Sequence, residues 1–351
     1  MLQKIKYHPF FIRLLNWEFW PIYISNIPVF FFWLIHAIRA RDMFFFTTVN
    51  PAIATGGFFG EEKHKIYRLI PREYLPKTLF IPATCARGDI ADRIRAAGMS
   101  YPLVCKPDIG ERGMHVKVID TPHALTQHAQ KMSGGIIIQE YIDYPLELSV
   151  MCHRYPYSGR MGVTSICKKA FLTVTGDGQN TLAHLIDKNP RAILQKNTLA
   201  KRMDLQQVPD AGETVLLEGI GNHCRGTQFL NANDWITPGL ETAILKVLSQ
   251  MPGVYYGRFD LRTSSIDDLN AGRAFLIMEF NGVGSEPAHI YDPAYPVVNA
   301  YKDVWRHWRI LYEISREQKA HGIASIHWRD GLESLRTYFL YKKKANLTYG
   351  L

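Results

Sequence analysis

Charged and amide side chains alternate along two apolar segments near the C-terminal end of the chain. Arg258 and Asp260 are two residues apart in GRFDLR, and Glu279 and Asn281 have the same spacing in MEFNG. Because side chains two residues apart in a strand point to one face, each pair acts together. Carboxylate and amide oxygens suit Mg²⁺, which usually binds one or two carboxylates plus substrate phosphates. The pattern indicates a magnesium–phosphate site, and a pair of solvated strand ends is the alternative.

A lysine stands at the end of another apolar run, directly before a glycine-containing loop. Lys106 is the second-last residue of YPLVCKP, and PDIGERGMHV, which follows Lys106, contains Gly110 and Gly113. Glycines in such a loop leave backbone N–H groups free to approach phosphate oxygens, and the lysine adds a point charge. An ordinary hairpin that only turns the chain is the alternative. The spacing differs from the P-loop pattern GxxxxGK[ST], so a phosphate site here is of another type.

The elements that must position these residues are strands and helices between residues 101 and 282. Short apolar or alternating runs bounded by Gly, Pro or polar residues predict strands, and a proline in the first turn marks two of the predicted helices. The predicted strands are 101–107, 114–120, 134–142, 146–154, 162–175, 254–263 and 274–282, and the predicted helices are 121–132, 182–189 and 238–251. Strands with segregated helices indicate an α+β architecture.

Taken together, these features resemble the ATP-grasp superfamily of carboxylate–amine ligases. The resemblance runs from about Lys63 to about Ala288 and is closest to D-alanine–D-alanine ligases and to the ATP-grasp module of cyanophycin synthetase. It implies an ATP-grasp fold, in which two α+β lobes grip ATP. We expect three regions: an aromatic and basic N-terminal segment at 1–60, an ATP-grasp catalytic region at 61–300, and a basic helical C-terminal extension at 301–351.

The resemblance also implies roles for particular residues. Phosphate contacts fall on lysines and on the glycines of the covering loop. IIIQEYI matches the hinge that meets adenine, and Glu147, five residues after it, matches a ribose-binding glutamate. The implied ATP-binding residues are Lys63, Lys106, Gly110, Gly113, Glu140, Tyr141, Ile142 and Glu147. The implied metal ligands are Asp260, Glu279 and Asn281, for two Mg²⁺ ions with Mn²⁺ as an alternative. The implied catalytic residues are Arg258, Lys169, Gly284 and Ser285, with Lys168 as the alternative to Lys169.

The implied reaction activates a carboxylate as an acyl phosphate, which an amine then attacks, with release of ADP and phosphate. Excluding water protects the acyl phosphate, and fixed positive charge stabilises the transferring group. Two alternatives stay open: a kinase-like phosphotransferase on the same ATP site, and a non-catalytic binder of membranes or nucleic acid. The expected partners are a small-molecule or lipid-linked carboxylate and an amine, with an anionic membrane surface and a homodimer as further options. No nucleic-acid motif is present, so no nucleic-acid partner is expected.

Two regions depart from the resemblance. The aromatic segment 1–60 stands where such ligases usually have a compact strand–helix domain, and NPAIATGGFFGEEK (50–63) at its end matches no substrate pattern. The loop NHCRGTQF contains His223 and Arg225, which suit an acidic acceptor or intermediate. A simple solvated surface loop is the equal alternative.

The net charge of +9 lies at the two ends of the chain. Residues 1–50 hold five Lys or Arg and two acids, residues 301–351 hold ten and five, and the remaining body is left with +1. The run 19–38 contains no charged residue, but Pro21 and Pro28 interrupt it, so a membrane span is disfavoured. An interfacial segment on a membrane and a buried hairpin of two short helices remain equal alternatives. The five cysteines form no CxxC pair, which favours a reducing compartment. We therefore expect a cytoplasmic protein, with attachment to the inner face of the membrane left open.

Overall fold

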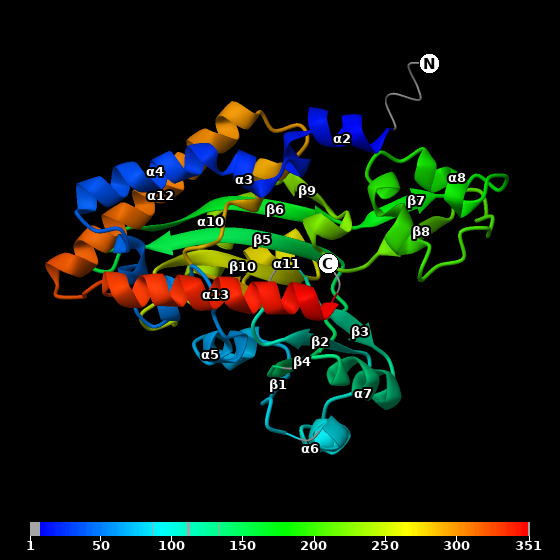
Figure 1. The fold of residues 1–351 in the computed structure, drawn as a ribbon, viewed down its shortest axis with the longest axis horizontal. Helices are drawn as coiled ribbons and strands as arrows, with labels where there is room; N and C mark the ends of the chain where they lie inside the picture. Colours follow the sequence, from blue (N-terminus) through cyan, green and yellow to red (C-terminus); the bar gives the residue numbers. More distant parts are fainter. Residues whose placement is uncertain (1–7, 86, 111–112, 133, 350–351) are drawn as a thin grey trace.

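A computed structural model describes residues 8–85, 87–110, 113–132 and 134–349 of the chain (Figure 1). Two antiparallel sheets with helices packed against them form its two lobes, with strand orders β1-β4-β2-β3 and β11-β10-β5-β6-β9. The predicted α+β architecture, with two α+β lobes facing one cavity, is confirmed. In Figure 1 the smaller sheet lies below the long strands of the larger one.

The four-stranded sheet carries Lys106 and the predicted adenine hinge. Its strands are β1 (Thr78–Ile81), β2 (Leu103–Pro107), β3 (Lys117–Ile119) and β4 (Ile136–Glu140). Helices α6 (Ile90–Ala96) and α7 (Pro122–Gln130) pack with it around a core that includes Ile81, Leu103 and Leu125. The strand predicted at 114–120 starts only at Lys117, because Gly113 and His115 have positive φ angles of 68° and 58°, which interrupt an extended backbone.

The five-stranded sheet carries the acidic and amide residues. Its strands are β5 (Leu146–Arg154), β6 (Met161–Ala170), β9 (Gln228–Asn231), β10 (Tyr256–Thr263) and β11 (Phe275–Asn281). Helices α10 (Pro238–Ser249), α11 (Ile266–Asn270) and α5 (Lys63–Tyr67) accompany it. The register places Asp260 opposite Glu279 and Arg258 opposite Asn281. A register shift follows directly after Asp260, so the paired positions stand at an irregularity in the ladder.

A small two-stranded unit extends from the large sheet. The strand predicted at 162–175 is divided in two, and β7 (Leu172–Thr175) pairs with β8 (Thr214–Glu218) instead of continuing β6. Short helices α8 (Leu182–Asp187) and α9 (Lys196–Leu199) give this unit its own core. Figure 1 shows the unit projecting at one end of the long strands.

The two ends of the chain form helices that meet over the large sheet. The N-terminal segment contains α2 (Pro9–Leu15), the 3-10 helix η1 (Trp17–Phe19), α3 (Ile22–Ser25) and α4 (Ile27–Ala40). The C-terminal segment contains α12 (Val297–Ala320) and α13 (Trp328–Tyr349). Figure 1 shows α4 lying along α12, and both helices contribute to one apolar core with the 3-10 helix η2 (Phe45–Thr48). The domain boundaries expected at 60 and 300 stay predictions.

The helices of the apolar run 19–38 do not form a buried hairpin. In α4 only His36 and Ala37 are buried, whereas Phe30, Phe31 and Ile38 have 54%, 54% and 67% of their surface exposed. That alternative is wrong because α4 packs on α12 through one face only, which leaves its other face uncovered. Within the described part of the chain, no helix has both the length and the apolar character needed to cross a membrane.

Candidate active site

All of the residues implied by the resemblance line one cavity of about 950 Å³ between the two sheets. The small sheet contributes Lys106 and Glu140, and the large sheet contributes Lys169, Asp260 and Glu279. The other implied residues that line it are Lys63, Gly110, Gly113, Tyr141, Ile142, Glu147, Arg258, Asn281, Gly284 and Ser285. Residues up to 222 positions apart in the sequence therefore meet at one site.

Asp260 is the most heavily bonded acid of the cavity. Its Oδ1 accepts hydrogen bonds from Arg258 Nε at 3.0 Å and from Ser149 Oγ at 2.6 Å. Its Oδ2 accepts from Arg258 Nη2 at 3.2 Å and from Asn281 Nδ2 at 3.3 Å. Burial by itself would raise the pKa of Asp260, but the charges of Arg258 and Lys169 outweigh it and lower the pKa to about 2. The carboxylate is therefore ionised at neutral pH.

Three lysines from three elements point into the cavity. Lys63 Nζ at the start of α5 donates to the carbonyl of Gly110 at 2.6 Å and lies 3.4 Å from Glu279 Oε1. Lys106 Nζ donates to Gln139 Oε1 and to the carbonyl of Met278, each at 3.0 Å. Burial lowers the pKa of Lys106 to about 8, and the nearby charge of Glu279 offsets this only in part.

The sequence does not decide whether Lys168 or Lys169 faces the cavity, and in the structure it is Lys169. Lys169 Nζ lies 3.2 Å from Glu147 Oε1 and 3.7 Å from Asp260 Oδ2. Burial would lower its pKa, but these two carboxylates outweigh it and raise the pKa. Lys168, the next residue along β6, instead lies over the ring of Trp235 with its Nζ 5.8 Å from the centroid. Neighbouring residues in a strand face opposite sides, so only one of the two lysines reaches the cavity.

Glu147 is held between two cations, one of which the sequence reasoning misses. Its Oε2 accepts from Arg262 Nε at 3.0 Å, while Oε1 faces Lys169. Arg262 also donates to the carbonyl of Ile142 at 2.8 Å and to the hydroxyl of Tyr141 at 3.3 Å. The signal for Arg262 was present, because it continues the two-residue alternation of Arg258 and Asp260 on the same strand face.

Part of the segment without a sequence assignment, 50–63, supports the turn after β11. Gly284 N donates to the carbonyl of Gly57 at 2.9 Å, and a Cβ at Gly284 would lie 2.5 Å from the carbonyl oxygen of Phe58. Ser285 Oγ donates to the carbonyl of Gly282 at 2.6 Å. The glycine at 284 is thus required by close backbone approach, and the segment supports the turn that carries Gly284 and Ser285.

His223 and Arg225 have internal partners, so the loop 222–229 is not a simple solvated loop. His223 Nε2 lies 2.8 Å from Glu18 Oε2, and Arg225 Nε lies 3.0 Å from Glu218 Oε2. Glu18 also pairs with Arg191 at 2.5 Å and is almost fully buried. Burial would lower the pKa of His223, but its hydrogen bonds to Cys224 and Glu18 outweigh it and raise the pKa. Sequence reasoning misses Glu18, since nothing local shows that its partners lie on the small two-stranded unit.

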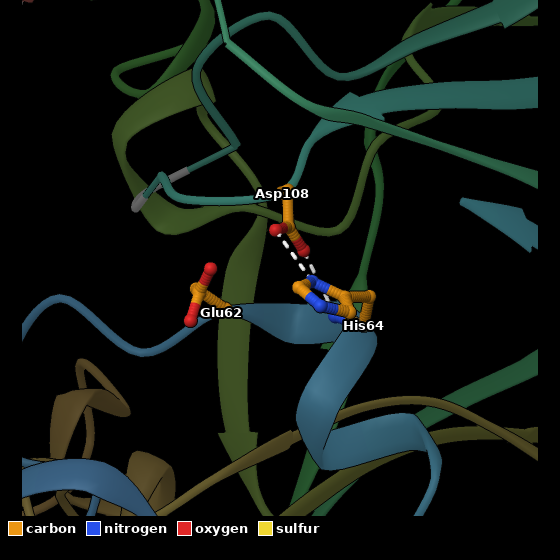
Figure 2. Close-up of side chains that lie close together, drawn as sticks. All are labelled: Glu62, His64 and Asp108. Carbon is orange, nitrogen blue, oxygen red and sulfur yellow. Dashed lines mark hydrogen bonds and ion pairs between the residues drawn. The ribbon is translucent and has the colours of Figure 1, made fainter. Parts of the chain in front are cut away.

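A cluster of Glu62, His64 and Asp108 stands behind the loop that carries Gly110 (Figure 2). Asp108 accepts from the backbone N–H of His64 at 2.8 Å and contacts its Nδ1 at 2.7 Å. The carbonyl of Asp108 also accepts from the N–H of Lys63 at 3.1 Å. Figure 2 shows no interaction between Glu62 and this pair, although one carboxylate oxygen of Glu62 lies within 4.8 Å of both, and the Glu62 carboxylate pairs with Lys65. The contacts tie the first turn of α5 to the end of β2, which positions Lys63 beside Gly110.

No protein-family model matches the sequence, and a search of curated proteins finds no match. Among the solved structures that match is a D-alanine–D-alanine ligase from Bacillus anthracis, with 14% identity and a TM-score of 0.40 over 74% of this chain and 69% of that one. The VanG D-Ala:D-Ser ligase from Enterococcus faecalis matches with 11% identity and a TM-score of 0.40 over 70% of this chain and 61% of that one. A bifunctional glutathione synthetase from Pasteurella multocida matches with 12% identity and a TM-score of 0.38 over 70% of this chain and 36% of that one. The chain spans about a third of the last protein's length. D-alanine–D-alanine ligases, which the motifs resemble, are thus among the matches. At these identities the similarity concerns the fold alone.

Proposed function

We propose that this protein is an ATP-dependent ligase that activates a carboxylate as an acyl phosphate for attack by an amine. One observation carries the proposal: lysines 63, 106 and 169 converge with Asp260 and Glu279 from both sheets on a single cavity. Burying ionised groups is costly unless they are paired and hydrogen-bonded, so a gathering of buried charges in one cavity favours a charged ligand there. A triphosphate with a divalent cation would complement this mixture of charges.

The nucleotide would bind with its phosphates beside the lysines and the loop from Gly110 to Gly113. Lys63 now donates to Gly110, and Lys106 donates to neutral oxygens, so both are close to a place where phosphate oxygens would be better acceptors. The adenine would lie against residues 140–142 at the end of β4, and Glu147 would lie near the ribose. These assignments follow the resemblance, and the common cavity supports them.

Asp260, Glu279 and Asn281 would hold magnesium, which we propose as two ions, with manganese as an alternative. The three side chains offer hard oxygen donors on adjoining positions of β10 and β11, which fits such an ion. Bound there, the metal would neutralise charge on the phosphates. Arg258 now occupies both oxygens of Asp260 and would have to release at least one of them.

The proposed reaction has two steps, and no side chain of the protein forms a covalent bond to the substrate in either. A carboxylate oxygen attacks the γ-phosphorus as its bond to the bridging oxygen breaks, which gives an acyl phosphate and ADP. The amine nitrogen then attacks the acyl carbon, loses a proton, and phosphate leaves. Arg258, with Nη1 3.2 Å from the carbonyl of Glu286 beside the Gly284–Ser285 turn, would stabilise the negative charge that develops on the oxygen of the attacked acyl group. Lys169 would neutralise charge on the transferring phosphate.

The test is ADP release by the full chain with amino acids, hydroxy acids and amino lipids as candidate substrates. Glu279→Gln keeps the shape of the side chain but removes its charge, and we expect a folded protein whose ADP release falls by about 10²–10³ or more. The matched control is Asp187→Asn, whose carboxylate pairs with Lys196 on the small two-stranded unit. Normal turnover in Glu279→Gln would refute the metal assignment. ADP release that needs a hydroxyl compound and no amine would support a phosphotransferase instead.

We also propose that the protein is cytoplasmic and lies against the anionic inner face of the membrane. Large apolar side chains exposed along α2 to α4, here called the apolar strip, support this: Phe10, Leu14, Leu15, Trp20, Ile22, Tyr23, Ile24, Ile27, Phe30, Phe31, Ile35 and Ile38. Arg13, Arg39 and Arg41 are exposed beside the strip, and the single acid of residues 8–41, Glu18, is buried. Apolar residues flanked by basic ones suit an anionic bilayer surface.

Vesicle co-sedimentation tests this location. Phe30→Ser with Phe31→Ser should reduce binding to phosphatidylglycerol-containing vesicles, while Val208→Ser, an exposed apolar residue on another part of the molecule, should not. Equal binding by all forms would refute the membrane assignment. Concentration-dependent self-association that the Phe30/Phe31 variant abolishes would assign the strip to a homodimer.

A further inference from the structure

The mouth of the cavity is apolar, although its floor is charged. Trp20, Ile22, Phe58 and Phe339 all line the cavity, and they have 38%, 50%, 37% and 59% of their surface exposed. A residue that both lines a cavity and meets solvent stands at its opening. Four large apolar side chains at one opening exceed what a small polar substrate requires.

The apolar wall continues inward from this mouth toward the polar floor. Phe59 lies behind Phe58 with ring centroids 5.6 Å apart and is only 8% exposed. The backbone of Phe58 touches the Gly284 turn, next to Ser285. Phe58 therefore links the solvent-exposed edge of the cavity to the Gly284–Ser285 turn, near which the acyl carbon would lie.

The same path meets the apolar strip on its other side. Trp20 and Ile22 belong to both the strip and the cavity lining, while Tyr23 and Ile24 belong to the strip alone. Trp17 lines the cavity just before them and stacks on Tyr291 with ring centroids 5.2 Å apart. Trp20 and Ile22 therefore connect the exposed apolar strip to the lining of the cavity.

We infer that the substrate is an amphiphile, a carboxylate or an amine carried on an acyl or alkyl chain, and that the wall from Trp20 to Phe59 holds that chain. The inference rests on the proposed ligase function and names the substrate class of its site. Each methylene transferred from water to an apolar site contributes about 0.8 kcal/mol, or about fourfold in affinity. Affinity should therefore rise with chain length until the wall is covered.

The experiment measures binding and turnover separately. N-acylglycines and n-alkylamines with two, six and twelve carbon chains are titrated below their micelle concentrations, by calorimetry, with the full chain. We expect affinity to rise by about fourfold per methylene between the short and middle probes. Ile22→Ser should weaken binding of the long probes by about tenfold or more and leave the shortest unchanged. Ile24→Ser is the matched control, because Ile24 is 45% exposed on the same short helix but does not line the cavity.

The outcomes separate this inference from the proposed function. Affinity that does not depend on chain length, or equal losses in Ile22→Ser and Ile24→Ser, would overturn the inference. ADP release with short polar substrates alone would overturn it while leaving the ligase intact. Conversely, chain-length-dependent binding without ATP binding or ADP release would refute the ligase and leave a site for amphiphiles. Adding phosphatidylglycerol vesicles to the turnover assay should raise the rate of ADP release when the substrate is a long-chain probe.

Discussion

Glu147 offers the sharpest test of the electrostatics, because it is a buried anion between two buried cations. Its carboxylate is 3.0 Å from Arg262 Nε and 3.2 Å from Lys169 Nζ, and the three residues are 4%, 6% and 8% exposed. Glu147→Gln keeps the size of the side chain and removes only the negative charge. Arg262 would then keep no carboxylate among its described partners, and Lys169 would keep Asp260 at 3.7 Å.

The expected cost follows from the burial. Removing one partner of a buried ion pair leaves an uncompensated charge and costs about 3–5 kcal/mol. With a urea dependence of about 3 kcal/mol per molar, the unfolding midpoint should fall by about 1–2 M. Glu147→Gln combined with Arg262→Gln removes both charges of the closest pair, so it should cost less than the sum of the two single changes.

Urea unfolding followed by tryptophan fluorescence and by circular dichroism provides the measurement, and coincident transitions justify a single free energy of unfolding. Asp187→Asn is the control, because Asp187 and Lys196 are 45% and 35% exposed in their side chains and such surface pairs contribute about 0–1 kcal/mol. The reasoning fails if Glu147→Gln loses no more than Asp187→Asn. It also fails if the double variant loses the full sum.

Three further predictions concern pH and packing. Burial lowers the pKa of Lys106 to about 8, and nucleotide phosphates beside it should raise that pKa, so ATP binding near pH 8 should take up a proton. Calorimetry in buffers of different ionisation enthalpy measures this uptake, and its absence would contradict the phosphate role of Lys106. Burial and Arg39 lower the pKa of His36 to about 4, so the folded state binds fewer protons than the unfolded state and stability should fall as pH falls from about 6.5 to about 4. His36→Phe should avoid about 2 kcal/mol of the stability that the protein otherwise loses at pH 5. If the free energy of unfolding of this variant depends on pH as it does in the unsubstituted protein, the prediction is wrong. A Cβ at Gly221 would lie 1.9 Å from Glu147 Oε1, so Gly221→Ala should weaken ATP binding, whereas Gly88→Ala has open space and should not.

Most strands of the two sheets could be predicted from the sequence, because alternation and apolar runs are local properties of the chain. The strands at 146–154 and 254–263 lie within two residues of β5 and β10. The sequence predicts neither β8 of the small unit nor β9 of the large sheet, since both strands carry little periodicity and depend on their partners. The strand predicted at 162–175 divides where its second part pairs away from the large sheet, which no local signal marks.

The sequence predicts the candidate residues but not how the fold brings them together. Spacing placed Arg258 with Asp260 and Glu279 with Asn281, and it could have included Arg262. It could not show that β10 and β11 pair with Asp260 opposite Glu279, since register depends on the whole sheet. The choice of Lys169 over Lys168 likewise required the orientation of β6 in the sheet.

The sequence by itself determined the residue types, their spacing along strands and the uneven charge, because these are properties of neighbours in the chain. Only the tertiary structure decided which apolar residues stay exposed and which distant charges pair. Glu18 meets His223, and Lys63 meets Glu279, each across about two hundred residues. The run 19–38 reads equally as a core or as a surface, because apolar side chains in a helix are buried only where another element covers them. In this fold α12 covers one face of α4 and leaves its other face exposed as part of the apolar strip. Trp20 and Ile22 of the same strip reach the lining of the cavity.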